Sequence, residues 1–200
     1  MRVLYIKANP KETKDSVSNL VGETFIERYR KANPEDEIDV LDLYKENWPH
    51  LDKEALDSYK SDSGLLQTTA IHFSNYDKYV FSTPMWNLGI PSILKAYFDY
   101  VVVSGITFRY NKWGIPLGLL RNKKAICIIA RGGKYDYWPM STFAFDKKYL
   151  KVILKFMGIK NIKFLTIENL NKDVNNFDKI VNIATEKANK LARLFETKRR

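Results

Sequence analysis

The chain is poor in several residue types whose abundance would define a class of protein. Its 200 residues include one cysteine, seven prolines and nine glycines. A single cysteine cannot form a disulfide within the chain, and the scarcity of glycine and proline excludes collagen-like and low-complexity sequence. Cys127 lies in an apolar run, so we expect it to be a small buried hydrophobic residue and not a redox centre.

Long hydrophobic segments are lacking as well. The strongly apolar run at 125–130 is much shorter than the roughly 20 residues that cross a bilayer. The first residues, MRVLYIK, contain no hydrophobic core of a signal peptide. We therefore expect a cytoplasmic protein with no membrane partner.

Two common phosphate-binding motifs are absent. The sequence has no G-x-x-x-x-G-K-[ST] and no G-x-G-x-x-G, which argues against a P-loop NTPase and against a dinucleotide held in the Rossmann manner. The two histidines, His50 and His72, have no cysteine or histidine at metal-ligand spacing. We expect no metal site and no hydrolytic centre.

Positive charge, in contrast, is plentiful. Lysine and arginine number 33 against 23 acidic residues, which gives a net charge of +10. The basic residues are interleaved with acids along the chain, so we interpret them mainly as a solvated surface and expect no nucleic-acid partner. A second interpretation is that they attract phosphorylated cofactors.

The remaining sequence alternates between strand and helix patterns. Strands are predicted at 2–7, 37–43, 78–82, 124–130 and 161–167, and helices at 16–33, 58–73, 91–101, 145–156 and 177–195. This order predicts one α/β domain over residues 1–200, a three-layer sandwich with helices on both faces of a five-stranded parallel sheet. The strand order 2-1-3-4-5, typical of a flavodoxin-like fold, is expected.

In such a sheet, ligands bind outside the carboxyl ends of the strands, where strands 1 and 3 diverge. The loops at 8–18, 83–90 and 130–139 are therefore the candidate binding segments. The first contains Ser16 and Ser18 at a helix start, where hydroxyls and free backbone N–H groups suit a phosphate. A simple N-cap is the alternative interpretation for these serines.

The other two loops suit a flat ligand. Met85 and Trp86 are large apolar side chains in a loop that is ordinarily polar, and a flat hydrophobic ligand or a dimer contact would account for them. Gly132 and Gly133 allow the backbone to approach a ligand closely, although a tight turn needs the same residues.

Several segments resemble one family. The stretch PMWNLGIPSILKAYFD at 84–99, GITFRY at 105–110, ARGG at 130–133 and SVS at 16–18 are similar to segments of FMN-dependent NADH azoreductases, which also reduce quinones. The pattern from Trp86 through Lys95 is also similar to NAD(P)H quinone oxidoreductases. Both families have the flavodoxin-like fold.

The resemblance implies bound FMN, with NADH or NADPH as the electron donor, in a homodimer. It implies no catalytic side chain, because flavin N5 takes up the hydride and passes two electrons to a quinone, azo compound or similar acceptor in a ping-pong cycle. The cofactor-binding residues that it implies are Asn9, Ser16, Val17, Ser18, Pro84, Met85, Trp86, Asn87, Leu88, Ala130, Arg131, Gly132, Gly133 and Tyr135. Tyr135, and Tyr110 from the partner subunit, would line the substrate pocket. A non-enzymatic electron-transfer or interaction protein on the same fold is the alternative.

Overall fold

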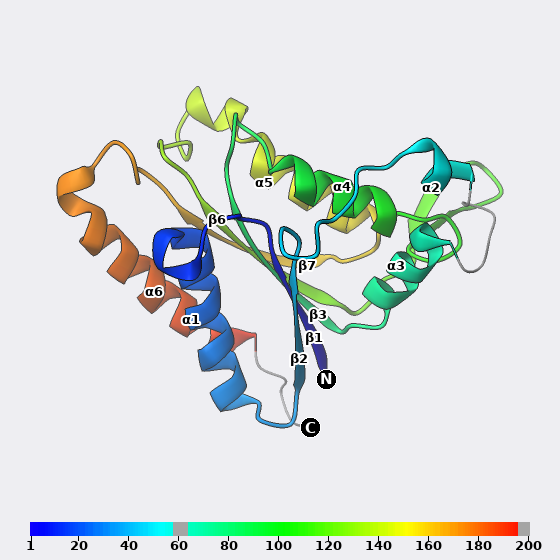
Figure 1. Cartoon of the computed structure of the whole chain (residues 1–200), viewed down its shortest axis with the longest axis horizontal. Coiled ribbons are helices and arrows are strands. Elements are labelled where there is room, and N and C mark those ends of the chain that lie inside the picture. The colour runs from blue at the N-terminus through cyan, green and yellow to red at the C-terminus, as the bar shows by residue number, and fades with distance from the viewer. Residues whose placement is uncertain (58–63, 196–200) are drawn as a thin grey trace.

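The main sheet is parallel and has five strands. A computed structural model describes residues 1–57 and 64–195. The strands are β1 (Arg2–Lys7), β2 (Glu37–Asp42), β3 (Lys78–Pro84), β6 (Lys124–Ala130) and β7 (Asn161–Ile167), in the order β2-β1-β3-β6-β7 (Figure 1). The flavodoxin-like α/β class and the parallel sheet are thus as predicted. Numbered along the chain, however, the fourth and fifth strands of the sheet are β6 and β7.

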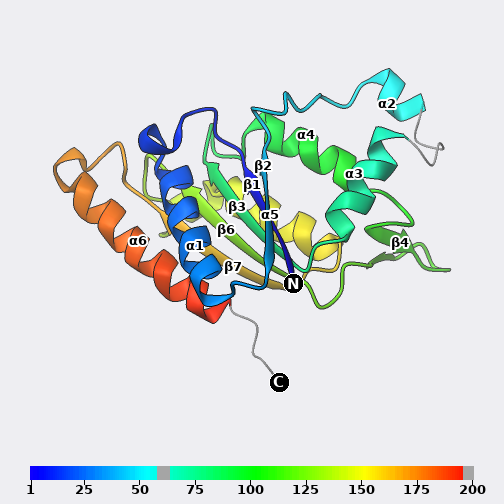
Figure 2. The same ribbon diagram turned by 60° about the horizontal axis from the view of Figure 1, so that its bottom comes forward.

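The numbering differs because the sequence prediction missed a small hairpin. Strands β4 (Phe108–Tyr110) and β5 (Pro116–Gly118) pair antiparallel outside the main sheet (Figure 2). Their turn contains Gly114 at φ +74°, and the Asn111 side chain accepts hydrogen bonds from the turn backbone. Strands of three residues are too short to produce a detectable alternation of polar and apolar side chains.

In the described residues, six α-helices connect and flank the strands. They are α1 (Val17–Ala32), α2 (Lys53–Asp57), α3 (Leu65–Ser74), α4 (Ser92–Val101), α5 (Phe145–Phe156) and α6 (Phe177–Leu194), with short 3-10 turns η1 (Thr13–Asp15), η3 (Met140–Phe143) and η4 (Val174–Asn176). The start of the helix predicted at 58–73 lies outside the described residues, and its described part begins at Leu65. The short helix α2 was not predicted.

Neighbouring residues of β1 contribute to two different hydrophobic clusters. Val3 and Tyr5 pack with residues of α1 and α6, which lie side by side in Figure 1. Leu4 and Ile6 pack instead with residues of α3, α4 and α5. This alternation follows from the two-residue period of a strand.

One glycine lets α1 lie close to the sheet. A Cβ atom on Gly22 would lie 2.3 Å from the Tyr5 hydroxyl oxygen and 3.0 Å from Ser82 Cβ. Real Cβ atoms essentially never approach a neighbour to 2.3 Å, so a larger residue here would force α1 or the buried Tyr5 side chain to shift.

Gly22→Ala is therefore expected to destabilise the fold by about 1–3 kcal/mol, the usual cost of overpacking. Alanine is the better helix former by roughly 1 kcal/mol, so helix propensity alone predicts the opposite sign. Urea unfolding measures the change, and Glu27→Ala at an exposed position of the same helix is the control. A stabilised Gly22→Ala protein would contradict the proposed contact.

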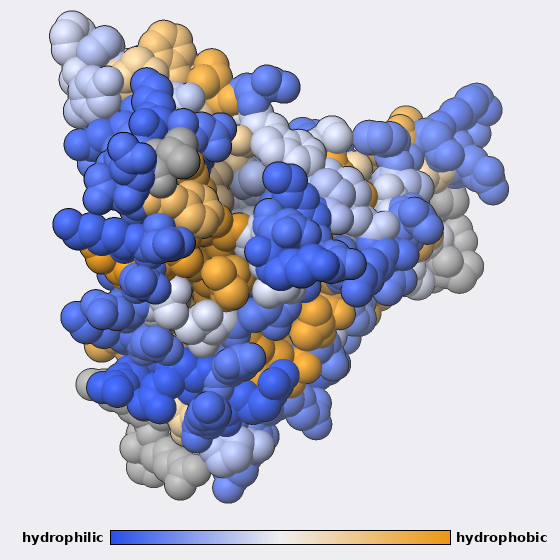
Figure 3. Space-filling model, turned by 60° about the vertical axis from the view of Figure 1, so that its left-hand side comes forward, coloured by the Kyte–Doolittle hydropathy of each residue, from blue (hydrophilic) through white to orange (hydrophobic). Residues whose placement is uncertain are grey.

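Charged and polar side chains project over much of the surface shown in Figure 3, and hydrophobic residues are visible mainly in the hollow between them. Among the described residues, no helix is long and apolar enough to cross a membrane. Cys127 is fully buried, and burial raises the pKa of its thiol. A thiol held in its protonated form is a poor nucleophile, in agreement with the structural role predicted for it.

Candidate functional site

The three candidate loops meet at the carboxyl edge of the sheet. They follow β1, β3 and β6, which are adjacent strands. Backbone hydrogen bonds extend the strand pairing into the loops. Ala8 N donates to Ser82 O (2.9 Å), and Met85 N donates to Ala130 O (2.8 Å). The loops that the sequence placed on one binding edge are therefore held beside each other.

Three polar side chains cluster at the start of α1. Asn9, Ser16 and Ser18 are almost completely buried. The Asn9 amide donates to Ser16 Oγ at 2.8 Å and to Ser18 Oγ at 3.3 Å, and the two hydroxyl oxygens lie 3.1 Å apart. Hydroxyl and amide donors converging at one point can bind the oxygens of a phosphate.

The backbone of α1 adds to this cluster. Ser16 is the N-cap, and its side chain and carbonyl accept hydrogen bonds from Asn19 N (3.2 Å) and Leu20 N (2.8 Å). In the described part of the chain this leaves the N–H groups of Val17 and Ser18 without a bonding partner. Free N–H groups at the positive end of a 16-residue helix favour an anion. Ser16 is thus both an N-cap, the alternative interpretation from the sequence, and a member of the polar cluster.

A buried hydrogen-bond chain supports the cluster from behind. Tyr5 donates to Ser82 Oγ at 3.2 Å, and Ser82 donates to Asn19 Oδ1 at 3.1 Å. Asn19 in turn donates through Nδ2 to Lys11 O, on the loop. Sequence reasoning missed Asn19 and Ser82, because only the packing of α1 on β3 brings them together.

The loop after β3 is a tight two-residue turn. Trp86 and Gly89 exchange two backbone hydrogen bonds of 3.0 Å each. Between them, Asn87 and Leu88 have φ values of +46° and +71°. Asparagine tolerates this left-handed conformation, but leucine rarely adopts it, and such strain is often found at functional sites. The turn holds Trp86 and Leu88 at the surface, 42% and 36% exposed.

In the loop after β6, the backbone carbonyls are hydrogen-bonded to a neighbouring loop, and two backbone N–H groups are not. The carbonyls of Arg131, Gly132 and Gly133 accept hydrogen bonds from the backbone of residues 169–171. Arg131 N donates to Ile167 O, whereas the N–H groups of Gly132 and Gly133 make no hydrogen bond within the described residues. A Cβ atom on Gly132 would lie 2.6 Å from Asn171 Nδ2, the end of an exposed side chain. The loop therefore offers two N–H donors to a ligand.

The Arg131 side chain does not point toward this donor edge. It is buried and forms a bidentate ion pair with Asp146 (2.8 and 2.9 Å) and a third bond with Glu168 (2.7 Å). Glu168 also accepts a hydrogen bond from Tyr135 N at 3.1 Å. The guanidinium thus holds together the loop after β6, the start of α5 and the end of β7.

Asp146 connects this network to the loop after β3. Its backbone N–H donates to Leu88 O at 3.1 Å, and its carboxylate is completely buried. One acidic residue therefore fixes the turn at 86–89 and the glycine loop relative to each other. No motif marks Asp146 or Glu168 in the sequence, and both were missed.

The two tyrosines predicted for the substrate pocket lie in different places. The Tyr135 ring packs against the backbone of Gly133, and the Arg131 guanidinium lies 5.7 Å from its centroid. Tyr110 is 58% exposed on the β4–β5 hairpin. Its neighbour Phe108 packs on Phe156, at the far end of α5 from Asp146, with 4.6 Å between ring centroids. Within one chain, Tyr110 therefore does not join the other predicted residues.

The chemistry of these donors fits FMN. Hydroxyls, an amide and a helix start suit its phosphate, and the free N–H groups of the glycine loop suit the carbonyl oxygens of its ring. The apolar surface of the 86–89 turn suits the flat ring itself. Among the described residues, no three His, Cys, Asp or Glu side chains form a cluster able to hold a metal.

Comparison with known proteins agrees with this geometry. A family model described as "Flavodoxin-like fold" matches residues 1–192, which places the chain in the flavodoxin-like class. The FMN-dependent NADH:quinone oxidoreductase of Clostridium perfringens strain ATCC 13124 is 46% identical over 201 residues, with 97% of this chain and 99% of that protein covered. The chain belongs to the family of FMN-dependent NADH:quinone oxidoreductases.

Solved structures give the same result. The crystal structure of the azoreductase AzrA has a TM-score of 0.89 at 32% identity, and the match covers 96% of this chain and 99% of that one. An FMN-dependent NADH-azoreductase from Bacillus anthracis, solved in complex with FMN, has a TM-score of 0.81 at 27% identity. That match covers 96% of this chain and all of the other.

Proposed function

We propose that this protein is an FMN-dependent oxidoreductase that transfers two electrons from NADH or NADPH to quinones, azo compounds or similar electron-poor aromatics. The observation that carries the proposal is the set of donors along one sheet edge, from the Asn9–Ser16–Ser18 cluster to the glycine loop. The names of the relatives, quinone oxidoreductase and azoreductase, support the same reaction class.

The predicted residues would share the work of holding FMN. Asn9, Ser16, Val17 and Ser18 would bind the phosphate, and Pro84 through Leu88 would lie along the ring. Ala130 through Gly133 would contact the pyrimidine edge through backbone atoms, with Tyr135 beside them. When bound, FMN supplies the two-electron chemistry through its N5 atom, so the protein needs no catalytic side chain. N–H groups at the pyrimidine edge would stabilise the negative charge that develops there on reduction.

We also propose that residues 1–200 form a single three-layer domain that functions as a cytoplasmic homodimer. Alternate residues of β1 pack in two different hydrophobic clusters, each with its own helices. This arrangement supports helices on both faces of the sheet. Exposed aromatic side chains support a dimer contact, notably Trp113 (72%) and Trp138 (81%). In such a dimer, Tyr110 of one subunit would reach the substrate pocket of the other.

The purified protein is expected to be yellow and to contain one FMN per chain. Addition of NADH or NADPH without oxygen should bleach the flavin, and a quinone or azo dye should restore the colour. Absorbance spectroscopy follows both half-reactions, and light scattering measures the mass of the FMN-loaded protein. A colourless protein that takes up no FMN when mixed with it would refute the proposal.

A further inference from the structure

Glu168 holds both ends of the segment from Arg131 to Tyr135. Arg131 Nη1 donates to Glu168 Oε1 at 2.7 Å, and Tyr135 N donates to the same oxygen at 3.1 Å. The Glu168 side chain is only 12% exposed, and the guanidinium that it contacts is almost completely buried. Its carboxylate is therefore largely removed from solvent, beside the glycine loop that is proposed to contact the pyrimidine edge of FMN.

The charged cluster around Arg131 carries one negative charge in excess. One guanidinium balances one carboxylate, and Asp146 already pairs with it through two bonds of 2.8 and 2.9 Å. Asp146 also lies in the first turn of α5, where a helix N-terminus favours negative charge. Glu168 directly follows β7 and does not lie at a helix start. The Glu168 carboxylate is therefore the charge that remains unbalanced.

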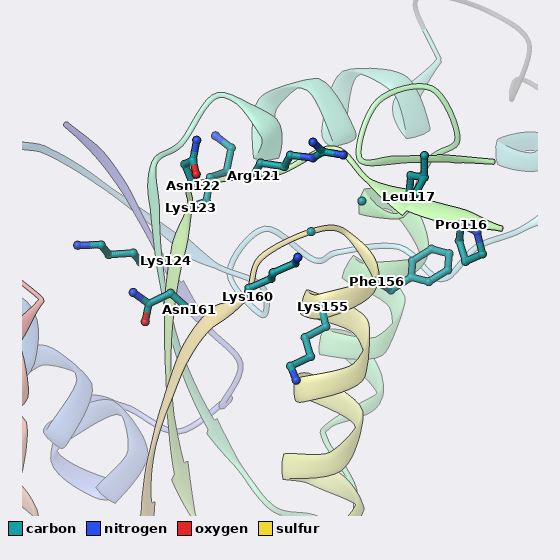
Figure 4. Close-up of a pocket in the computed structure, with 12 residues that line it drawn as sticks. Pro116, Leu117, Arg121, Asn122, Lys123, Lys124, Lys155, Phe156, Lys160 and Asn161 are labelled. Carbon is teal, nitrogen blue, oxygen red and sulfur yellow. The ribbon is translucent and has the colours of Figure 1, made fainter. Parts of the chain in front are cut away.

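Other cations do not neutralise this cluster. In the part of the chain that the structure describes, no cation except Arg131 forms a salt bridge with either carboxylate. Arg121, Lys155 and Lys160 lie at the amino edge of the sheet, around a cavity that no acidic residue lines (Figure 4). The seven residues of β6 separate the two edges by roughly 20 Å, well beyond the screening length of about 8 Å at physiological salt.

A structural role alone does not require a carboxylate at position 168. The side-chain amide oxygen of a glutamine can accept the same two hydrogen bonds, from Arg131 Nη1 and Tyr135 N. Glutamine would also avoid the cost of removing a second negative charge from water. The charge of Glu168, and not its hydrogen bonds, is thus the feature that needs an explanation.

Reduction changes the charge of a flavin. When NADH gives up a hydride and becomes NAD⁺, the ring receives two electrons and one proton, and it therefore gains one negative charge. Donors at the pyrimidine edge stabilise this charge, whereas a nearby carboxylate repels it. The repulsion is stronger for a carboxylate shielded from water than for one on the surface.

We propose that the charge of Glu168 lowers the reduction potential of bound FMN, which makes the reduced cofactor a stronger electron donor to acceptors that are hard to reduce, such as azo compounds. The inference rests on the proposed function and on its placement of residues 130–133 at the pyrimidine edge. Glu168 acts through its charge, without touching the donor or the acceptor, and it reduces the driving force for the reaction with NADH.

The reduction potential of the FMN-saturated protein, measured by anaerobic equilibration with a reference dye, tests the proposal. Glu168→Gln retains the two hydrogen bonds and removes the charge, so it should favour reduction about tenfold, which equals roughly 30 mV for a two-electron couple. Glu168→Asp retains the charge but shortens the side chain, and it should leave the potential nearly unchanged.

Asp136→Asn is the matched control for the loss of a charge. It removes an exposed carboxylate from the loop after β6, where Asp136 pairs with Lys134 at 3.6 Å. In about 0.15 M salt such a charge is screened, and the potential should hardly change. Stopped-flow spectroscopy adds a second measurement: Glu168→Gln should be reduced faster by NADH and should pass electrons to an azo dye more slowly.

An unchanged potential in Glu168→Gln would overturn the assignment. An equal shift in Glu168→Asp would also overturn it, because contacts and not charge would then set the potential. If Glu168→Gln does not fold, Asp146→Asn removes a charge from the same cluster, and a potential that does not rise in that variant counts equally against the proposal.

The FMN content of the same samples tests the proposed function separately. A protein that takes up no FMN refutes the proposed function. A protein that binds FMN, but whose potential does not respond to the charge at position 168, refutes only the role given to Glu168.

Discussion

Asp146→Ala is expected to destabilise the protein by about 3–5 kcal/mol, the range for removing one partner of a buried ion pair. The substitution leaves the Arg131 guanidinium buried with Glu168 as its one remaining carboxylate. Because folded proteins are stable by only roughly 5–15 kcal/mol, the loss is a large share of the total. Urea unfolding of the FMN-free protein measures it.

The same substitution should also weaken FMN binding. Asp146 fixes the 86–89 turn and the glycine loop relative to each other, and without it both loops gain freedom that binding must then remove. We expect a loss of about tenfold or more in FMN affinity, measured by quenching of flavin fluorescence. Asp146→Asn, which retains the shape of the side chain, should fold more readily and allow the affinity to be measured if the alanine variant does not fold.

Asp136→Ala is the matched control. Asp136 lies in the loop after β6 and is exposed, and its ion pair with Lys134 spans 3.6 Å. Exposed pairs contribute about 0–1 kcal/mol, so this variant should have nearly normal stability and affinity. If Asp146→Ala behaves like Asp136→Ala, the buried network does not position the loops.

Periodicity and topology explain why the three loops of the candidate site could be predicted to lie together. Strands and helices alternate strongly enough along the chain to fix the order of the first, third and fourth sheet strands. That order places three loops on one edge whatever the details of the packing. Ser16 and Ser18 could be assigned to that edge because their position at a helix start is a local property of the sequence.

Contacts between distant segments could not be predicted in the same way. Arg131 was expected at the flavin because the ARGG segment resembles that of azoreductases, yet its side chain pairs with an acid 15 residues away and with another 37 residues away. The two-residue turn at 86–89 could not be predicted with its left-handed backbone, because Asn87 suits that conformation but Leu88 does not. Strand β3 continues through Pro84, two residues beyond its predicted end.

Ser18→Asp is expected to reduce FMN affinity by about 100-fold or more. Ser18 is completely buried, with its hydroxyl 3.1 Å from that of Ser16 and bonded to Asn9. A carboxylate in this position would face the proposed phosphate. Two like charges at about 4 Å repel by roughly 4 kcal/mol at an effective dielectric constant of 20, and 1.4 kcal/mol corresponds to tenfold in affinity.

Riboflavin has the same ring as FMN but no phosphate. Its binding therefore distinguishes repulsion of the phosphate from a loss of structure in the whole flavin site. Its affinity should change little in Ser18→Asp, so the preference of the protein for FMN over riboflavin should collapse. Ser18→Ala removes the hydroxyl without adding charge, and about a tenfold loss of FMN affinity is expected for it. An acidic residue near a helix N-terminus is otherwise favourable, so the helix itself should persist. If Ser18→Asp weakens riboflavin and FMN equally, the start of α1 does not bind the phosphate, and the flavin must be oriented differently on this sheet edge.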